Sequence, residues 1–387
     1  MFLSLTLFSC SDDVVNSEPP PQINTAWVRT FGGQFSDIGF AAAYGHNHTI
    51  LAAGYTNSVS SGRPDFYFSI MDTLGGILRT GTIGDAGADV CRDATGCFDQ
   101  GFILAGLTGS FGAGGYDVYL VRLDSLGDTM WSRTYGGPGD DRADDIIQCS
   151  EGGFLMTGWS DSQSDSDDVY IVRTDNSGNV LWERNFGGNL NDHGTSATEL
   201  TGGDFIIAGY TQSTTDSGYH VLLIRCSRQG DSLWSRVMGH GRVDAVVEIS
   251  EGEILLGANT KFTESGFDER RLILVDSLGD EIVARSIDNS LDDHYLYDMI
   301  LLPDGSICIG GYIDWSGAGR FPELSFCDGE SLTNMMAGGI LETSITSSIS
   351  YISALTCNPG GEKIYAVGSV SKGSGQVDMC LWCIDNY

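Results

Sequence analysis

An internal repeat of roughly fifty residues is the feature that most constrains how this chain can fold. In its clearest copies, a short apolar run lies between two glycines, as at 101–106 and 153–158. A second run with the pattern Asp-Val-Tyr-(Leu/Ile)-Val-Arg follows at 117–122 and 168–173. The second glycine of the first run marks seven copies of one unit: Gly54, Gly106, Gly158, Gly209, Gly257, Gly311 and Gly368.

Each copy contains four short runs rich in Val, Ile, Tyr, Phe and Trp, separated by turns of Gly, Asp and Ser. Such runs predict β-strands, and no long stretch has the period of an amphipathic helix. In the third copy we expect strand A near 141–149, B at 153–160, C at 168–174 and D at 180–186. Four antiparallel strands repeated seven times predict an all-β fold, the seven-bladed β-propeller.

The phase of the repeat predicts how the ring closes. The first copy is preceded by 25–31, which matches an outer strand D, and the chain ends with 377–385, which matches a strand C. We therefore expect the N-terminal strand to complete blade 7, which otherwise lacks its outer strand. This closure would remove the exposed sheet edges that favour aggregation, and it predicts one domain over 25–387.

The N-terminal segment 1–10 is a short apolar run that ends in Leu-Phe-Ser-Cys10. This ending resembles the lipobox of bacterial lipoproteins, which implies a lipid on Cys10; a fragment of an ordinary signal peptide is the alternative. Residues 11–24, with three consecutive prolines, predict a flexible tether. The two acidic residues near its start resemble surface-export signals of Bacteroidetes lipoproteins. We therefore expect an extracytoplasmic protein anchored to the bacterial outer membrane, facing either the periplasm or the cell surface.

The repeat resembles the Asp-Gly-Gly-rich propeller repeats of surface proteins of Bacteroidetes and related bacteria. It is more weakly similar to the quinoprotein-type repeat, whose pattern Asp-x-x-Gly-x-x-x-Trp fits Asp124 to Trp131. Those enzymes use an adjacent Cys-Cys pair, which this chain does not have. We favour a non-catalytic module that binds a protein or a glycan. The alternatives are a propeller enzyme, either a quinoprotein-like oxidoreductase or a carbohydrate-active one, and an envelope-assembly scaffold.

The chain is strongly acidic, with 52 Asp and Glu against 20 Lys and Arg and a net charge of −32. Such a surface repels phosphate backbones, so we expect no nucleic-acid partner. It attracts cations, so Ca²⁺ is a possible cofactor. The sequence indicates no other cofactor.

Loop lengths distinguish the two faces of the predicted ring. The A–B and C–D turns are tight, whereas the B–C loops are long and rich in Ser, Gly and Asp. The strand directions place the B–C loops and the D–A crossovers on one face, where we expect ligands to bind. Trp159 and Trp315 interrupt the repeat at or near this face, with Asp314 and Arg320 nearby. Such a group suits a sugar or a peptide, and packing of loop against loop is the alternative.

Six copies carry an aspartate just before strand A, here called the Asp column: Asp37, Asp89, Asp141, Asp192, Asp244 and Asp293. The column could bind Ca²⁺ at the mouth of the channel. We favour a structural role, in which each carboxylate accepts backbone N–H groups and fixes its D–A crossover.

Histidines lie beside the column in three neighbouring crossovers, which suggests a transition-metal group. Its members would be His193, His240, His294, Asp192, Asp244 and Asp293. Three solvated histidines are the alternative. Elsewhere, Cys308 and Cys327 could face each other across a hairpin and form a disulfide.

Overall fold

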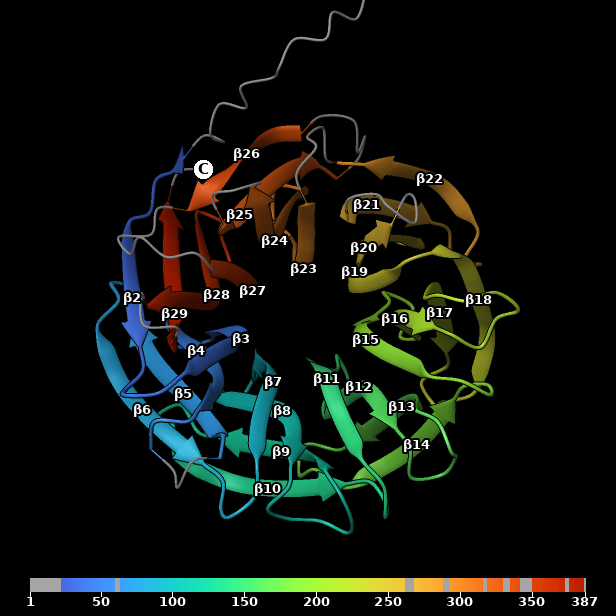
Figure 1. The fold of residues 1–387 in the computed structure, drawn as a ribbon, viewed down its shortest axis with the longest axis horizontal. Helices are drawn as coiled ribbons and strands as arrows, with labels where there is room; N and C mark the ends of the chain where they lie inside the picture. Colours follow the sequence, from blue (N-terminus) through green and yellow to red (C-terminus); the bar gives the residue numbers. More distant parts are fainter. Residues whose placement is uncertain are drawn as a thin grey trace, which may run out of the picture.

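The chain forms a ring of seven antiparallel sheets around a central axis (Figure 1). Within the described ranges every regular element is a β-strand, and none is a helix able to cross a membrane. The predicted seven-bladed β-propeller is therefore confirmed. The computed structural model describes residues 22–59, 63–261, 268–287, 293–315, 319–329, 335–341, 350–372 and 376–385.

Four strands per blade run from the inner strand A to the outer strand D. Blade 1 consists of β3 (Asp37–Gly45), β4 (Thr49–Thr56), β5 (Asp65–Asp72) and β6 (Ile77–Ile83). Blade 2 consists of β7 (Asp89–Gly96), β8 (Phe102–Thr108), β9 (Asp117–Leu123) and β10 (Thr129–Tyr135). Blade 3 consists of β11 (Asp141–Gln148), β12 (Phe154–Ser160), β13 (Asp168–Thr174) and β14 (Val180–Phe186). Blade 4 consists of β15 (Asp192–Glu199), β16 (Phe205–Thr211), β17 (His220–Cys226) and β18 (Ser232–His240).

The last three blades follow the same order. Blade 5 consists of β19 (Arg242–Ser250), β20 (Glu253–Lys261), β21 (Asp268–Val275) and β22 (Glu281–Ser286). Blade 6 consists of β23 (Asp293–Leu301), β24 (Ser306–Trp315), β25 (Gly319–Asp328) and β26 (Met335–Leu341). Blade 7 consists of β27 (Ser350–Cys357), β28 (Lys363–Lys372), β29 (Gln376–Asp385) and the N-terminal β2 (Trp27–Phe31).

The N-terminal strand closes the ring as the repeat predicted. β2 pairs antiparallel with β29, from Trp27 opposite Cys383 to Phe31 opposite Met379. The sequence did not predict β1 (Gln22–Ile23), which pairs parallel with β26 as a fifth strand of blade 6. These two residues were assigned to the tether, because so short a segment carries no strand periodicity.

The apolar core lies between neighbouring blades. Each blade is packed between two others, so strand β9 is buried along its whole length, whereas the outer β10 is largely half-exposed or exposed. One cluster joins Phe66 and Phe68 of blade 1 to Phe102 and Tyr119 of blade 2. Burying a side chain of this kind contributes about 1.5–3 kcal/mol. Because the core is shared in this way, each blade depends on its neighbours for stability.

The repeat glycine is explained by a close approach of strand B to strand A. A Cβ at Gly158 would lie 1.9 Å from the carbonyl oxygen of Arg142. At five other marker glycines a Cβ would lie 1.8–2.0 Å from the equivalent carbonyl oxygen: Gly54, Gly106, Gly209, Gly311 and Gly368. In blade 5 the register places Ala258, not Gly257, at this position, opposite Val243. The sequence marker for blade 5 was therefore wrong by one residue.

A β-bulge in every inner strand inserts an extra residue just after this close approach. In β11 the register shifts between Ala143 and Asp145, so Asp144 is the extra residue. Bulges commonly re-aim side chains next to functional sites. The bulge residues of blades 1 to 7 are Phe40, Arg92, Asp144, Thr195, Asp244, Tyr297 and Ser353.

The possible disulfide between Cys308 and Cys327 does not form. Both cysteines are buried and free. Cys308 pairs with Phe326 and Cys327 pairs with Ile307, so the two thiols lie on opposite faces of the sheet and in different core clusters. The prediction failed because the register is displaced by one residue.

Candidate functional site

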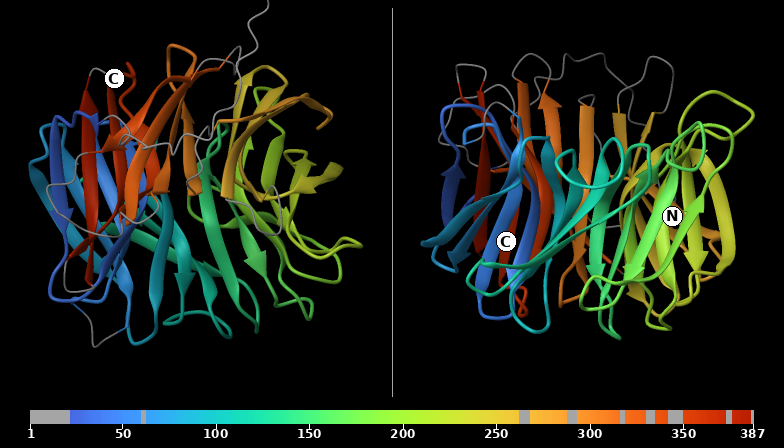
Figure 2. Two further views of the ribbon diagram at one scale, coloured as in Figure 1. Left: turned by 45° about the horizontal axis from the view of Figure 1, so that its top comes forward. Right: turned by 90° about the horizontal axis from the view of Figure 1, so that it is seen from below.

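A cavity of about 370 Å³ lies on the axis of the ring and is lined by residues of all seven inner strands. Figure 2 shows these strands running between two faces that carry the loops. In β11, the lining residues Arg142 and Asp144 are among the first four of the strand, and Arg142 pairs with Trp159 where β12 leads into its B–C loop. The cavity therefore lies toward the face that carries the B–C loops.

Two Arg–Asp pairs of the same geometry line the cavity. Arg142 donates from Nε to Asp144 Oδ1 at 2.8 Å, and Arg242 donates from Nε to Asp244 Oδ1 at 2.8 Å. A third arginine, Arg92, donates to Asp144 Oδ1 at 3.3 Å. Burial acts to raise the pKa of Asp144, but Arg142 and Arg92 together hold that pKa below its usual value. At Asp244 burial outweighs the single arginine, so its pKa is raised.

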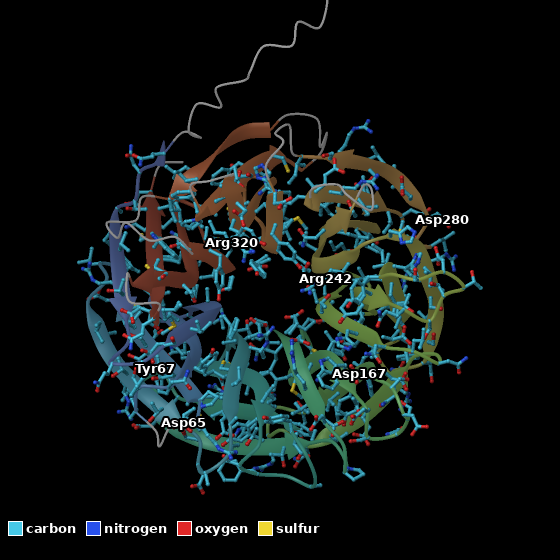
Figure 3. All side chains as sticks on the ribbon, viewed as in Figure 1. Asp65, Tyr67, Asp167, Arg242, Asp280 and Arg320 are labelled. Carbon is cyan, nitrogen blue, oxygen red and sulfur yellow. The ribbon has the colours of Figure 1, made fainter. Side chains whose placement is uncertain are left out.

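These pairs leave part of each guanidinium facing the cavity. Arg142 and Arg242 bind their aspartates through Nε and Nη2, and among the described residues neither Nη1 has a hydrogen-bond acceptor. The arginine side chains are 28% and 39% exposed, whereas Asp144 and Asp244 are 8% and 4% exposed. Figure 3 shows Arg242 at the edge of the central opening. The carboxylates therefore fix the arginines while a donor remains available to a ligand.

A pair of carboxyl groups, Asp93 and Asp145, lies deeper in the same cavity. Burial, followed by the proximity of Asp145, raises the pKa of Asp93 well above its usual value. Burial also raises the pKa of Asp145, so both carboxyl groups keep their protons to a higher pH than exposed ones do. Asp93 accepts the backbone N–H of Ile146 at 3.0 Å, and Asp145 accepts that of Ala197. Each carboxyl is thus also bonded to the next blade.

Aromatic side chains surround the arginines. The guanidinium of Arg242 lies 5.9 Å from the ring centroids of both Tyr210 and Tyr295. Tyr295 stacks on Tyr312 at 5.7 Å, and Arg320 lies over Tyr312 at 4.7 Å. The rings give the mouth of the cavity flat apolar surfaces beside its charges.

Four members of the Asp column are buried at the start of the inner strands and bonded to their own blades: Asp37, Asp89, Asp141 and Asp192. Asp37 accepts the N–H of Gly33 at 2.8 Å and the hydroxyl of Ser58 at 2.9 Å. Asp141 accepts the equivalent donors, Gly137 N–H and Ser162 Oγ, each at 2.7 Å. These donors bond Oδ2 of each carboxylate, which supports the structural interpretation, whereas the buried Oδ1 of Asp141 and of Asp192 has no partner among the described residues.

The other two members do not belong to the column. In blade 5, Arg242 occupies the register position that Arg142 has in blade 3. Asp244 therefore corresponds to the bulge residue Asp144 and lines the cavity. In blade 6 the register gives the column position to His294, and Asp293 lies one residue earlier. Both assignments were wrong because neither of these two copies has an aspartate at the column position.

The three predicted histidines are not brought together. His193 stacks on Trp159 with ring centroids 5.2 Å apart and bonds to Asp167 Oδ2 at 2.9 Å and Tyr210 Oη at 2.7 Å. Burial lowers its pKa despite Asp167, so the imidazole is mainly neutral at pH 7. The other two histidines have different neighbours.

His294 is buried in a charged cluster between blades 5 and 6. Its Nδ1 lies 2.9 Å from Glu323 Oε2 and 3.2 Å from Arg270 Nη2. The third histidine, His240, contacts Asp216 instead. The predicted metal group thus divides into three separate environments.

The predicted ligand group is also divided. Trp159 stacks on His193, which lines the cavity. Asp314 and Arg320 instead pair with each other at 3.0 Å, beside Tyr312. The side chain of Trp315 lies outside the described residues. The sequence missed the cavity arginines, although they lie one and three residues after the column position. Comparing the copies at these two offsets would have found Arg92 and Arg142, because the residue type there varies from copy to copy. Arg242 could not be found in this way, because the column position of blade 5 was wrongly assigned.

The blades and the polar axial cavity define the chain as a seven-bladed β-propeller with a candidate ligand site on its axis. No protein-family model matches the chain, and no curated protein matches it. Solved structures are similar over almost the whole chain. Sqt1 from Chaetomium thermophilum has 10% identity and a TM-score of 0.53, covering 94% of this chain and 100% of Sqt1.

Two further structures are similar. The WD40 domain of Pan2 from Neurospora crassa has 10% identity and a TM-score of 0.52, covering 95% of this chain and 98% of that one. A protein of unknown function from Dyadobacter fermentans has 9% identity and a TM-score of 0.54, covering 95% and 100%. At these identities the likeness establishes the fold alone, and one fold can host many functions.

Proposed function

We propose that this chain is a non-catalytic binding module of the bacterial cell envelope, and that it holds a carboxylate-bearing ligand in its axial cavity. The observation that carries the proposal is the pair Arg142 and Arg242. Each is held by a nearly buried aspartate and turns a donor without an acceptor toward the cavity. Guanidinium groups fixed in this way favour carboxylate ligands over neutral ones.

The size and lining of the cavity limit the ligand. A volume of about 370 Å³ suits a ligand of one or two sugar rings or a short peptide end. Tyr210 and Tyr351 also line it, and rings of this kind pack against sugars and apolar side chains. The carboxylate could belong to a uronic sugar of an acidic glycan or to the C-terminus of a peptide. Both sources agree with an envelope protein that binds a glycan or a protein.

The test is calorimetric titration of the purified chain with a galacturonate disaccharide, its neutral galactose counterpart, and a tripeptide with a free or an amidated C-terminus. We expect only carboxylate forms to bind, and Arg142→Gln or Arg242→Gln to weaken binding about 10- to 100-fold. Arg133→Gln is the control, because Arg133 is exposed on outer strand β10. Equal binding of charged and neutral forms, or no binding of any, would contradict the proposal.

The envelope location rests on the lipobox-like end at Cys10, which lies outside the described residues. A lipid on Cys10 would hold the propeller at the outer membrane through residues 11–21. In a bacterial host, the full chain should partition into the detergent phase of a Triton X-114 extract, and Cys10→Ala should move it to the aqueous phase. A wild-type chain in the aqueous phase with an unmodified Cys10 thiol would exclude the anchor.

A catalytic role has one feature in its favour, the buried carboxyl groups of Asp93 and Asp145, whose pKa values are both raised. Such pairs serve acid–base catalysis in carbohydrate-active enzymes. However, both carboxyl groups accept backbone N–H groups of the next blade, which supports a structural role. The net charge of −32 argues against a nucleic-acid partner.

A further inference from the structure

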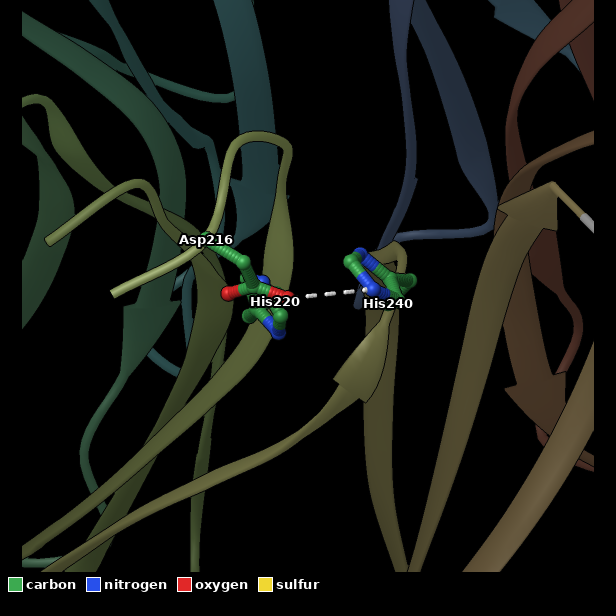
Figure 4. Close-up of side chains that lie close together, drawn as sticks. All are labelled: Asp216, His220 and His240. Carbon is green, nitrogen blue, oxygen red and sulfur yellow. Dashed lines mark ion pairs between the residues drawn. The ribbon is translucent and has the colours of Figure 1, made fainter. Parts of the chain in front are cut away.

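Three potential metal ligands meet at the B–C loop end of blade 4 (Figure 4). Asp216 comes from the B–C loop, His220 begins strand β17 and His240 ends strand β18. Their ligand atoms all lie within 4.8 Å of one another. Among the described residues no other group of three His, Cys, Asp or Glu side chains meets this condition.

His220 is a departure from the repeat. The residue that pairs with the end of strand B at the start of strand C is aspartate in blades 1, 2 and 3: Asp65, Asp117 and Asp168. In blade 4 the same register position, opposite Thr211, is His220. The equivalent positions of blades 5, 6 and 7 hold Glu269, Phe321 and Asp378, so blade 4 alone has a histidine here. The blade itself therefore does not require this histidine, which points to a role specific to blade 4.

A second departure brings His240 opposite His220. The pairing of β17 with β18 is interrupted between His220 and Leu222, so that His220 pairs with His240 rather than with the residue expected from the register. Their ring centroids are 4.3 Å apart. Bulges of this kind re-aim side chains at functional sites. Two independent changes in one blade thus converge on the same two imidazoles.

The distances from Asp216 to the two histidines suit a tetrahedral ion. His220 Nε2 lies 3.0 Å from Asp216 Oδ1, and His240 Nε2 lies 3.4 Å from Asp216 Oδ2. Ligands that bind Zn²⁺ at 2.0–2.2 Å in a tetrahedron lie about 3.3 Å apart. His220 is 8% exposed, and its buried Nε2 makes no hydrogen bond of good geometry, although it is close to Asp216. A buried nitrogen without a partner is unfavourable unless it meets a ligand.

The loop around Asp216 holds its carboxylate in place. Thr214 Oγ1 donates to Asp216 Oδ1 at 3.0 Å and also to the backbone carbonyl of Asp216 at 3.1 Å. Gly218, at φ +129°, allows the turn that returns the chain to His220.

We propose that Asp216, His220 and His240 bind one divalent transition-metal ion of the Zn²⁺ class. Two imidazoles and one carboxylate are typical ligands of Zn²⁺ and of Co²⁺, Ni²⁺ and Cu²⁺, whereas Ca²⁺ requires more oxygen ligands. Three protein ligands leave a fourth position to solvent. Asp216 and His240 are more than half exposed, so an ion held here is reachable from the loop face.

The test is equilibrium dialysis and calorimetry of the untagged full chain with Zn²⁺, and absorption spectroscopy with Co²⁺. We expect one Zn²⁺ per chain, no competition from Ca²⁺, and the visible absorption of four-coordinate Co²⁺. His220→Ala, His240→Ala and Asp216→Ala should each weaken Zn²⁺ binding more than about tenfold. His240→Ala replaces an exposed side chain, and thermal melting without metal should show that it stays folded.

The matched control is His46→Ala, because His46 is an exposed histidine of blade 1 outside the group. This variant should bind Zn²⁺ like the wild type. The proposal is overturned if the wild type binds no Zn²⁺ at micromolar concentration. It is also overturned if the three variants retain wild-type affinity, because the bound ion would then lie elsewhere.

Discussion

The carboxylate of Asp298 in blade 6 accepts a 2.6 Å hydrogen bond from the backbone N–H of Leu355 in blade 7. Asp298 follows the bulge of β23, so its side chain reaches the neighbouring inner strand. The same position makes the equivalent bond at three other junctions: Asp93 to Ile146, Asp145 to Ala197, and Ser196 to Val246. One side-chain position therefore joins several blades on the channel side.

The Asp298 bond predicts an unusual pH dependence of stability. Burial raises the pKa of Asp298 to about 6, although Leu355 and Met299 N–H groups act to lower it. In the unfolded chain the group titrates near pH 3.9. The folded state thus retains the proton between about pH 4 and pH 6, so this group makes the free energy of unfolding fall as pH rises through that window. Above about pH 6 its contribution is constant.

Asp298→Asn isolates this contribution, because asparagine keeps an acceptor for Leu355 but does not titrate. The variant should gain stability relative to the wild type between pH 4 and pH 6, by up to about 3 kcal/mol. Asp298→Ala should lose about 1–3 kcal/mol at pH 4, where the wild-type group is protonated, because the Leu355 N–H loses its partner. Urea unfolding of the wild type and the two variants at pH 4, 5, 6 and 7.5 measures these differences in stability. A difference between wild type and Asp298→Asn that does not vary with pH would refute the assignment.

The structural role of the Asp column predicts that its aspartates stabilise the fold without bound Ca²⁺. Asp89 accepts Ser110 Oγ at 2.6 Å and Asp85 N–H at 3.1 Å, as well as the hydroxyl of Thr108. Asp89→Ala should cost about 1–3 kcal/mol, because these donors lose their acceptor. Asp85→Ala, in the same crossover but exposed, should change stability by less than about 0.5 kcal/mol.

Thermal melting at fixed ionic strength, with EDTA and then with Ca²⁺, completes this test. The wild type and Asp89→Ala should each melt at the same temperature in both buffers, apart from the small non-specific effect of any cation on so acidic a chain. A large stabilisation by Ca²⁺ that Asp89→Ala abolishes would instead support the carboxylate ring as an ion site.

The fold was predictable from the sequence because its repeated units carry repeated physical requirements. Gly158, which lies against the carbonyl of Arg142, has no room for a Cβ, and the buried runs must be apolar, so both features recur in the printed sequence. The site was less predictable, because its residues occupy positions at which the repeat does not require a particular residue type. Arg242 and His220 become visible only after the register is known. The bulge that brings His240 opposite His220 has no sequence signature at all.

Ring closure predicts that the first strand of the propeller is essential. β2 pairs with β29 over five residues, and Trp27 Nε1 donates to the carbonyl of Thr73 in blade 1. Deleting residues 25–31 would expose a strand edge and the apolar side chains that it covers, each worth about 1.5–3 kcal/mol. Such a loss rivals a total stability of about 5–15 kcal/mol, so we expect aggregation or loss of cooperative melting.

Replacing Gln22 and Ile23 by Gly-Ser is the control for this deletion, because β1 contributes only two paired residues to blade 6. That variant should melt cooperatively, within a few degrees of the wild type. If the deletion variant melted like the wild type, β2 would not be needed for closure.

Two turn glycines with positive φ predict different effects of substitution by alanine. Gly178, at φ +78°, lies in the C–D turn of blade 3, and a Cβ there would be 2.9 Å from the Trp131 ring of blade 2. Tyr135 also donates to the carbonyl of Gly178 at 2.7 Å. Gly305, at φ +86°, has nothing within 4 Å of a Cβ. Gly305→Ala therefore introduces backbone strain alone, which costs about 1–2 kcal/mol.

Gly178→Ala introduces the same strain and also displaces Trp131, which packs at the junction of two blades. We expect it to cost at least about 1 kcal/mol more than Gly305→Ala, since overpacking of a fixed side chain typically costs about 1–3 kcal/mol. The measurement is the midpoint of urea unfolding for the two variants and the wild type, together with the fluorescence of the tryptophans in the folded state. Equal losses in the two variants would mean that the Trp131 contact adds nothing to the stability of the junction. A larger loss in Gly178→Ala, with altered fluorescence, would show that this contact helps to join blades 2 and 3.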